Sequence, residues 1–419
     1  MAIPGANILP TLFLPFLAYC GFYKKLVNDI QTMEKTPALK VLLVFAGIGF
    51  CYAFVFYGKE REVPRSAHAH EHAHHHDHHH QEYQNSGTST IPDTARLVTG
   101  QGEFIFSWNK ELTAAFPEDA REFEPAMHGG FNEDPETGIV YTGIPDYGLC
   151  AISPDLKEWT KLGTDERLKD NIHGIVFFVH KGKKHLAVAQ EGKRVLILNL
   201  DGSIVSDLLK PRGNEFDFAP ANEFFSSEES NFGVTDVTYL DGRLYVAHGY
   251  SDGDFVLTIE EQDGSWTWGK LAWGGKGEEP GQFQTAHGIY AHDDHILVAN
   301  RAAGQVVRFT REGKFVDMFE DIPEKSRVCN VSYKEEHFFF NALNAIGDMK
   351  SAPIYAHTGQ ELVSTIIPGE LGIPVLSNIH HVWPHIVQAE DGSQQLYLLV
   401  HGWNKGKYAV LKLEGAGTD

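Results

Sequence analysis

Cysteine and basic residues are scarce in this sequence. The 419 residues include four cysteines and no C-x-x-C pair, so neither a disulfide framework nor a thiolate metal site is indicated. Cys150 and Cys329 lie in the body of the chain, and a single bond between them is the one pairing left open there. Lys and Arg number 35 against 56 Asp and Glu, which gives a formal net charge of -21. An acidic protein repels phosphate backbones, so nucleic acid is not an expected partner.

Long apolar runs are confined to residues 1–65. Residues 38–58 match the roughly 20 apolar residues that a transmembrane helix needs. Residues 8–23 are apolar but short and contain two prolines, so a second span, a re-entrant piece or an interfacial helix is open. We expect residues 1–65 to be a membrane anchor with one or two spans, of which 38–58 fits best. Four lysines precede or begin this stretch and three basic residues follow it, a small bias that places the body on the lumenal or extracytoplasmic side.

A histidine-rich tract separates this anchor from the rest of the chain. Residues 67–80 read AHAHEHAHHHDHHH and contain nine histidines. The tract is interpreted either as a metal-collecting or pH-sensing tether, or as a low-complexity linker that binds metal only incidentally. We expect residues 66–95 to be a disordered linker, because such a composition needs no packed core.

A repeated pattern of short strands fills residues 96–419. Each copy has an apolar strand, a turn and a second strand that ends in a small or polar residue, and six copies start about 43 to 63 residues apart. Glycine is abundant at 41 residues, which suits tight turns. The spacing predicts an all-β fold, a six-bladed β-propeller, with residues 97–108 supplying the outer strand that closes the ring.

Histidine recurs at one position of the repeat. The first strand of each blade faces the central channel, so side chains at the same repeat position should converge on the axis. Converging imidazoles suit zinc, copper or iron, whereas an isolated His before Gly would be a hydrogen-bonded core residue. A shift of register would replace the last of the histidines by His381 or His385. The six residues at this position are His128, His173, Thr235, His287, Cys329 and His380.

The second strands end in another layer of polar residues. We expect these residues to line the mouth of the channel, where Tyr and Arg beside a metal could act as acid–base and carboxylate-binding groups. Polar residues at such a rim can also be simple turn formers. The layer consists of Gln190, His248, Arg301, Asn341 and His401, with Tyr250 just beyond His248.

Two long stretches resemble a known family. The sequences FGVTDVTYLDGRLYVAHGYSDGDFV and EEPGQFQTAHGIYAHDDHILVANRAAGQVVRFTREGKFV are similar to the NHL-repeat propeller of peptidyl-α-hydroxyglycine α-amidating lyase. The resemblance runs from about residue 172 to 414. It implies a zinc ion bound by His173, His287 and His380, a catalytic Tyr250, and Arg301 in the place of a family arginine.

The sequence also departs from that family. The family's structural calcium uses a backbone group that matches Ile175 and an Asp that is replaced here by His381, so calcium is not expected. Ser251 stands in the place of a family cysteine, and one family arginine has no counterpart in the first blade. His128, His248 and His401 match no family feature. These differences favour metal binding over the specific amidating substrate.

Three functions remain open on these residues. The first is a zinc-dependent carbon–nitrogen lyase that cleaves a hemiaminal-like α-hydroxyglycine to an amide and glyoxylate, or a relative with a changed small-molecule or peptide substrate. The second is an iron or copper redox enzyme that uses all four histidines. The third is a non-catalytic scaffold for a protein partner, because fold alone does not give function.

Overall fold

The computed structural model describes residues 42–47, 50–55, 96–373, 376–389 and 391–415. The chain divides into two compact units, Met1–Asn85 and Ser86–Asp419. In the first unit, strands β1 (Leu42–Gly47) and β2 (Phe50–Val55) pair antiparallel. The helix expected over residues 38–58 is therefore not what the structure has at these positions.

The physical reason is that hydropathy does not separate an apolar helix from an apolar strand. Valine, phenylalanine and tyrosine in this stretch favour strands. No helix among the described residues is both long and apolar enough to cross a membrane. The apolar residues 8–23 and the segment 66–95 lie outside the described residues, so the anchor, the linker and the side of the membrane stay predictions.

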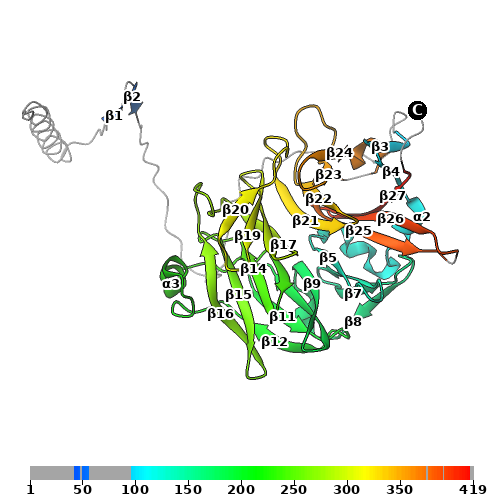
Figure 1. Cartoon of the computed structure of the whole chain (residues 1–419), viewed down its shortest axis with the longest axis horizontal. Helices are drawn as coiled ribbons and strands as arrows, with labels where there is room; N and C mark the ends of the chain where they lie inside the picture. Colours follow the sequence, from blue (N-terminus) through cyan, green and yellow to red (C-terminus); the bar gives the residue numbers. More distant parts are fainter. Residues whose placement is uncertain (1–41, 48–49, 56–95, 374–375, 390, 416–419) are drawn as a thin grey trace, which may run out of the picture. The chain divides into compact units, whose positions relative to one another are not determined.

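Six antiparallel sheets make up the described part of the second unit (Figure 1). Blade 1 has β5 (Phe131–Glu133), β6 (Val140–Ile144), β7 (Gly148–Ile152) and β8 (Trp159–Leu162). Blade 2 has β9 (Ile172–His180), β10 (Lys183–Gln190), β11 (Arg194–Leu198) and β12 (Ile204–Leu208). Blade 3 has β13 (Asp236–Leu240), β14 (Arg243–His248), β15 (Phe255–Gln262) and β16 (Ser265–Gly274). Blade 4 has β17 (Ala286–His292), β18 (His295–Asn300), β19 (Gln305–Thr310) and β20 (Phe315–Met318). Blade 5 has β21 (Val328–Lys334), β22 (His337–Ala342), β23 (Ile354–His357) and β24 (Leu362–Ile366). Blade 6 has β25 (Ile379–Gln388), β26 (Gln394–Gly402), β27 (Lys407–Leu413), β4 (Phe104–Trp108) and β3 (Val98–Gln101).

The ring closes by pairing strands from the two ends of this unit. β27 pairs with β4, with Leu411 opposite Trp108, and β3 pairs with β4 on the outer edge. Figure 1 shows β3 and β4, in cyan, beside the red strands β26 and β27. The inner strands contact one another in the order β5, β9, β13, β17, β21 and β25, and β25 returns to β5. The predicted six-bladed propeller and the predicted closure by residues 97–108 are confirmed.

The two ends of the propeller differ in their connections. At one end, here called the turn end, tight hairpins join the first to the second strand and the third to the fourth. Asp241 and Gly242, with φ of 49° and 87°, form such a two-residue turn, which requires left-handed backbone at both positions. The other end, here called the loop end, carries the connections between blades. Its helices are α2 (Lys110–Ala114), η1 (Glu118–Ala126), η2 (Glu166–Lys169), α3 (Ala219–Ser226) and η3 (Pro368–Leu371).

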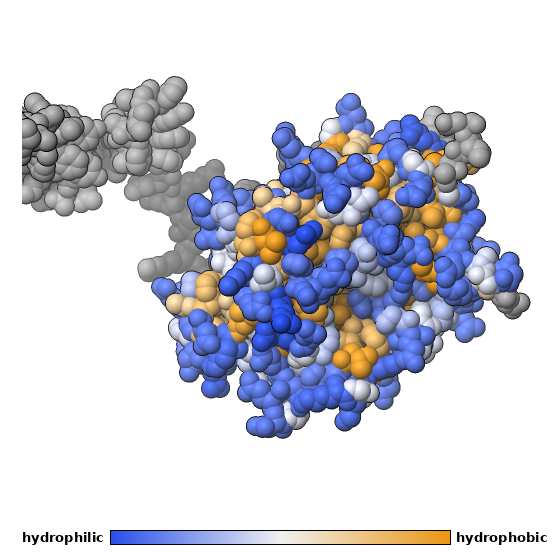
Figure 2. Space-filling model, viewed as in Figure 1, coloured by the Kyte–Doolittle hydropathy of each residue, from blue (hydrophilic) through white to orange (hydrophobic). Residues whose placement is uncertain are grey.

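Apolar cores lie between neighbouring blades. Val176, Ala187 and Val195 of blade 2 pack with Val237 and Val246 of blade 3 in one cluster. The middle strands are buried on both faces, which explains why they read as continuous apolar runs. The face seen in Figure 2 is mostly hydrophilic with apolar residues in separate patches, which is ordinary for a protein surface. The packing therefore leaves the axis as the place where polar side chains are enclosed.

A charged network joins the inner strands of three blades at the turn end. The buried carboxylate of Glu133 in β5 accepts hydrogen bonds from His385 Nδ1 at 2.8 Å and Trp383 Nε1 at 3.3 Å, both in β25. Lys334 of β21 also donates to it. His385 Nε2 lies 2.8 Å from the carbonyl oxygen of Pro154. Blades 1, 5 and 6 are thus joined at this end, and His385 is engaged there and not in a metal site.

Candidate metal centre

Four histidine rings meet on the axis toward the loop end. His128 lies just before β5, and His173, His287 and His380 lie in β9, β17 and β25. The ring centroid of His380 is 4.2 Å from that of His128, 4.5 Å from that of His173 and 4.9 Å from that of His287. The structure thus brings together the four histidines that share one repeat position in the sequence.

Hydrogen bonds across the blades orient two of these rings. His173 Nδ1 donates to the carbonyl oxygen of Thr235, and His287 Nδ1 donates to that of Cys329 at 2.7 Å. With the proton on Nδ1, each ring presents the lone pair of Nε2 to the interior. Metal-binding histidines are commonly fixed by this kind of carbonyl contact. The two non-histidine positions of the repeat, Thr235 and Cys329, therefore contribute through their backbone.

Burial keeps these imidazoles neutral. Desolvation, with the charge of neighbouring His128 added, lowers the pKa of His173 to about 3. Burial also holds the pKa values of His287 and His380 well below the ordinary value. Neutral imidazole is the form that binds a metal ion, so no proton has to be removed from these rings near neutral pH.

Several ring nitrogens at this centre have no protein partner. Among the described residues, His128 Nε2 and both nitrogens of His380 are buried without a hydrogen bond. Buried polar atoms are normally satisfied, so this group calls for a ligand. One ligand atom from each of His128, His173 and His380 lies within 4.8 Å of the others. This buried triad could hold a metal ion, and imidazole donors suit zinc, copper or iron.

His128 is supported from outside the triad. Its Nδ1 lies 3.1 Å from Asn171 Nδ2 and 3.4 Å from the carboxylate of Glu191, and Asn171 also donates to Glu191 at 2.6 Å. The indole of Trp403 stacks on the His128 ring at 5.3 Å between centroids. A carboxylate behind a histidine ligand fixes the ring and raises its basicity. Glu191 is 35% exposed and His128 is 11% exposed, so this side of the centre faces the channel mouth.

Tyr250 and Arg301 stand beside the histidines. The Tyr250 hydroxyl oxygen lies 3.0 Å from His287 Nε2 and 3.3 Å from His173 Nε2, and it accepts from Arg301 Nη1 at 2.9 Å. The guanidinium of Arg301 also lies 5.0 Å from the centre of the Tyr250 ring. Within the described residues Arg301 forms no salt bridge, so a guanidinium beside the centre has no carboxylate partner. Burial raises the pKa of Tyr250 to about 12, so the phenol is protonated in the metal-free protein.

The resemblance implied a different trio from the one with the shortest mutual distances. It named His173, His287 and His380, whereas the structure groups His128 with His173 and His380. His287 instead directs Nε2 at the Tyr250 hydroxyl. All four rings nevertheless lie within 4.9 Å of a neighbour by centroid distance. The fourth histidine is the feature by which this centre differs from the expected one.

Four residues that were expected at the mouth of the channel lie elsewhere in the structure. The side chains of Gln190, His248, Asn341 and His401 are fully buried and do not line the mouth. Gln190 donates to the carbonyl of Arg167, which lies in the loop before its own blade. The other three likewise contact backbone of a loop or neighbouring blade. These residues, which lie at or one before the end of a second strand, thus turn between blades and satisfy backbone groups of the inter-blade segments.

His248 shows what these buried residues do. Its Nε2 accepts from the Gly233 N–H at 3.1 Å, and its Nδ1 lies 2.7 Å from Ser251 Oγ. Tyr250 N–H donates to the Gly233 carbonyl at 3.0 Å, so His248 holds the segments on both sides of Tyr250. A Cβ at position 233 would lie 1.9 Å from the Tyr250 carbonyl oxygen, which requires glycine there. His248 therefore positions Tyr250 and does not contact the mouth.

Two more histidines have structural contacts away from the centre. His401 Nδ1 lies 2.9 Å from the Gly129 carbonyl oxygen and holds the segment that carries His128. His381 is not a member of the triad and packs against Phe131, with 5.9 Å between ring centroids. His380 and not His381 or His385 is thus the residue of β25 at the centre. Cys150 and Cys329 are both buried and free in the described chain, so the bond left open between them is absent.

Sequence reasoning missed Glu191, Asn171 and Trp403. Glu191 follows Gln190, the last residue of β10, and Trp403 follows Gly402, the last residue of β26. Arg301 likewise follows Asn300, the last residue of β18. The signal that could have found Glu191 and Trp403 is therefore the residue one step after the second strand, and not the last residue of that strand.

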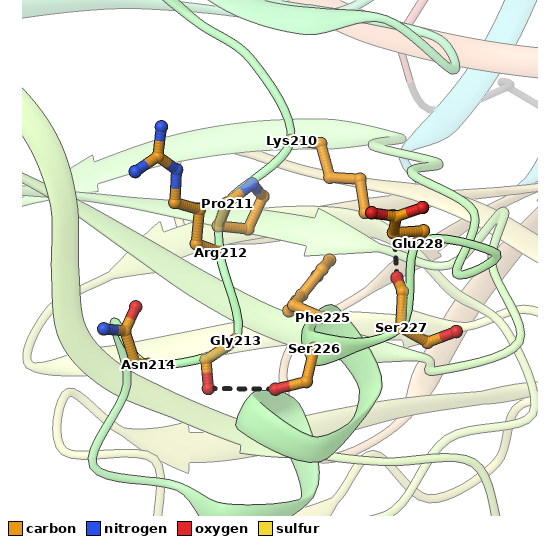
Figure 3. Close-up of a pocket in the computed structure, with 9 residues that line it drawn as sticks. All are labelled: Lys210, Pro211, Arg212, Gly213, Asn214, Phe225, Ser226, Ser227 and Glu228. Atoms are coloured by element: carbon orange, nitrogen blue, oxygen red, sulfur yellow. Dashed lines mark hydrogen bonds between the residues drawn. The ribbon is translucent and has the colours of Figure 1, made fainter.

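A separate pocket of about 430 Å³ lies between β12 and the end of α3 (Figure 3). Lys210 Nζ donates to the Ser227 carbonyl at 3.3 Å, and Ser226 Oγ donates to that of Gly213 at 3.4 Å. In Figure 3 the Arg212 side chain points away from Phe225, which is also one of the lining residues. The ammonium group is used to hold the chain after α3, and none of the lining residues belongs to the histidine centre.

Comparisons with known proteins give the fold context. The sequence matches no protein-family model and no curated protein. Solved structures with similarity include a luciferin-regenerating enzyme, with 13% identity, TM-score 0.47, and 77% of this chain and 96% of that chain covered. A catalytically inactive virginiamycin B lyase from Staphylococcus aureus has 12% identity, TM-score 0.40, and coverages of 68% and 94%. A chain of a nidogen/laminin complex has 12% identity, TM-score 0.40, and coverages of 68% and 95%. At these values the similarities carry no argument about activity.

Proposed function

We propose that this protein is a metal-dependent enzyme whose reaction takes place at the loop end of the propeller axis. The observation that carries the proposal is the group of enclosed histidine rings, two of them with unpartnered nitrogens, next to the Tyr250–Arg301 pair. A structural metal site would need no tyrosine and no uncompensated guanidinium beside it. Perturbed groups gathered around an enclosed centre are typical of active sites.

The reaction we propose is the cleavage of a carbon–nitrogen bond in a hemiaminal-like α-hydroxyglycine, as the resemblance implies. A metal ion held by His128, His173 and His380 would supply Lewis acidity toward the substrate oxygen. Arg301 would hold the substrate carboxylate, since its guanidinium has no carboxylate partner among the described residues. Tyr250 is protonated in the metal-free protein, so it would accept the proton of the substrate hydroxyl only as the phenolate, a form that the bound metal ion and the charge of Arg301 would favour.

The proposed step balances without an oxidant or a reductant. The carbon–oxygen double bond of glyoxylate forms as the hydroxyl proton leaves toward Tyr250. The carbon–nitrogen bond breaks with its electron pair on nitrogen, and a proton returns to that nitrogen to give the amide. Proton transfer by a positioned side chain of this kind contributes about 10² to 10⁴-fold to a rate.

The test is glyoxylate release from an α-hydroxyglycine peptide by the full chain loaded with zinc. We expect release that falls at least about 100-fold in the Y250F variant, because the proton acceptor is lost. A variant at the exposed Glu279, E279Q, is the matched control and should keep full activity. If the metal-loaded protein releases no glyoxylate, the amidating reaction is rejected, whereas the proposed metal centre is not.

A second function is favoured by the fourth histidine. Four imidazoles suit iron or copper as well as zinc, and a redox enzyme could use them all. Elemental analysis of the purified protein, together with its visible colour and paramagnetic signal, separates the two functions. A protein that holds no metal would instead favour a scaffold.

A further inference from the structure

The residue directly after a second strand carries a charged or aromatic side chain in every other blade. Glu191 follows β10 in blade 2, Arg301 follows β18 in blade 4, and Trp403 follows β26 in blade 6. The same position of the other three blades holds Pro145, Gly249 and Leu343. A carboxylate, a guanidinium and an indole thus come to the histidine group from three directions, because the blades of a propeller are arranged radially around its axis.

The Glu191 carboxylate has one oxygen without a protein partner. Asn171 Nδ2 at 2.6 Å and His128 Nδ1 at 3.4 Å both lie against Oε2. Within the described part of the chain, Oε1 makes no hydrogen bond, and no lysine or arginine pairs with this carboxylate. The side chain is 35% exposed, so a molecule that enters the mouth can reach it. A carboxylate accepts at both oxygens, and the unused one suits a group that is rich in N–H donors.

Trp403 adds an aromatic surface next to the same histidine. Its indole stacks on the His128 ring, with 5.3 Å between centroids and 23° between planes, and Glu191 lies at the Nδ1 edge of that ring. Trp403 is itself only partly buried. A carboxylate and an aromatic ring are the groups that bind an ammonium ion, the first through charge-assisted hydrogen bonds and the second through its π-face.

Arg301 supplies the opposite charge. It has no carboxylate partner among the described residues, just as Glu191 has no lysine or arginine. The rings of His128 and His173, whose centroids are 4.6 Å apart, lie between the two charged groups along the line of contacts. An extended two-residue ligand spans about 7 Å, so its two ends can pair with groups on either side of these rings. The two charges are therefore complementary to a molecule with a carboxylate at one end and an ammonium group at the other.

We infer that the site takes a short aminoacyl-α-hydroxyglycine with a free amino terminus, whose ammonium group is bound by Glu191 Oε1 and the Trp403 indole. This inference rests on the proposed function and names its substrate class, with Glu191 and Trp403 as the residues that determine specificity. The carboxylate of the same molecule pairs with Arg301. A blocked amino terminus has no charge to offer, so it leaves the Glu191 carboxylate unpaired in a partly enclosed site.

The test is the affinity of the full chain, saturated with zinc, for three unreactive analogues that lack the hydroxyl group: alanylglycine, N-acetyl-alanylglycine and N-succinyl-alanylglycine. Calorimetric titration at pH 7 measures the dissociation constants under conditions in which an α-amino group, with an ordinary pKa of about 8, is mostly protonated. The E191Q variant keeps the shape of the side chain without its charge, and E279Q, at the exposed Glu279, is the matched control. The H380A variant measures the background from the histidines of residues 67–80.

We expect wild type and E279Q to bind alanylglycine about tenfold more tightly than the acetylated analogue, since a hydrogen bond between charged groups contributes on this order. The succinylated analogue, which brings a second carboxylate toward Glu191, should bind most weakly. In E191Q the preference for alanylglycine should vanish, whereas a residue that only supports the His128 ring would weaken both ligands equally. Equal binding of these two ligands by wild type overturns the inference. A preference that persists in E191Q also overturns it, because another group then holds the amine.

The wild-type ranking decides the question if E191Q does not fold, since a succinylated analogue that binds as tightly as the acetylated one overturns the inference. Glyoxylate release from alanyl-α-hydroxyglycine and from its N-acetyl derivative separates the inference from the proposed function. Selective binding without any glyoxylate release rejects the proposed reaction and supports the recognition of the ammonium group. Equal rates of release from the two substrates at low concentration support the reaction and reject that recognition.

Discussion

The two ends of the propeller axis enclose polar groups in opposite ways. At the turn end, the Glu133 carboxylate receives hydrogen bonds from His385, Trp383 and Lys334. At the loop end, His380 has no partner at either ring nitrogen among the described residues. Burying an unpaired polar group costs free energy, and at the turn end the protein itself supplies the partners of Glu133. The loop end is complementary to something that the chain does not itself supply.

The largest effect on metal affinity is expected from His380→Ala, which removes a histidine ring at the loop end. His380 lies nearest the other three rings, so we expect metal affinity to fall by more than about 100-fold, beyond the 10 to 100-fold that outer partners cost. Metal would then no longer stabilise the protein, a loss of about 2.7 kcal/mol where the free metal is at 100 times the dissociation constant. Metal titration and thermal unfolding with and without chelator measure both quantities.

The metal-free protein provides the control for this change. Because the His380 ring has no hydrogen bond to lose, the metal-free variant should differ from wild type by only about 1 kcal/mol. The histidines of residues 67–80 are common to both proteins, so a metal titration of His380→Ala that matches wild type would show that the loop end is not a metal centre, and the comparison of the two ends would fail.

The second effect concerns the turn end, where Glu133→Gln breaks the charged network. The variant leaves Lys334 and His385 without their carboxylate, so we expect a loss of about 3 kcal/mol in the free energy of unfolding. Metal affinity should stay within about twofold of wild type, because the turn end is separate from the metal centre. Denaturant unfolding and metal titration on the same samples distinguish the two ends.

The pH dependence of stability sharpens the same prediction. Burial alone would raise the pKa of Glu133, but the hydrogen bond from His385 and the charge of Lys334 lower it below the ordinary 4.5. A carboxyl with a lowered pKa contributes stability above its unfolded pKa and loses that contribution as the pH falls through its folded pKa. The wild-type protein should therefore lose stability more steeply than Glu133→Gln below about pH 4.5. Parallel curves in this range would contradict the role given to the carboxylate.

The smallest effect is expected from Glu191→Gln, behind His128. Glutamine keeps the shape but weakens the support of the His128 ring, so metal affinity should fall about tenfold. Thermal stability of the metal-free protein should change little, because Glu191 is partly exposed. Glu279→Gln again serves as the exposed control, and an equal response of the two variants would remove Glu191 from the site.

Repetition made the fold and the four histidines predictable. Each blade places the same inner-strand position on the axis, so His128, His173, His287 and His380 were found without knowledge of their contacts. The orientation of the rings was not predictable, since it depends on the carbonyls of Thr235 and Cys329 in neighbouring blades.

Two expectations failed for reasons of register and hydropathy. Gln190 was placed at the mouth, although its neighbour Glu191 faces the centre, because one residue along a strand reverses the direction of the side chain. The apolar residues 42–55 include strands where a helix was expected, because an apolar run has no period that separates the two.

The pairing of β4 with β27 has a consequence for the order of events in synthesis. His128 and His380 come from opposite ends of the propeller sequence, and the last blade is finished only when its first-made strands meet its last-made ones. No nascent chain on the ribosome can hold the complete histidine group before that meeting. Loading with the ion that we propose for this centre would therefore be a late event in the life of each molecule, because contacts so distant in sequence form slowly. An incomplete chain lacks part of the histidine group. The finished chain brings all four histidines together when β4 pairs with β27.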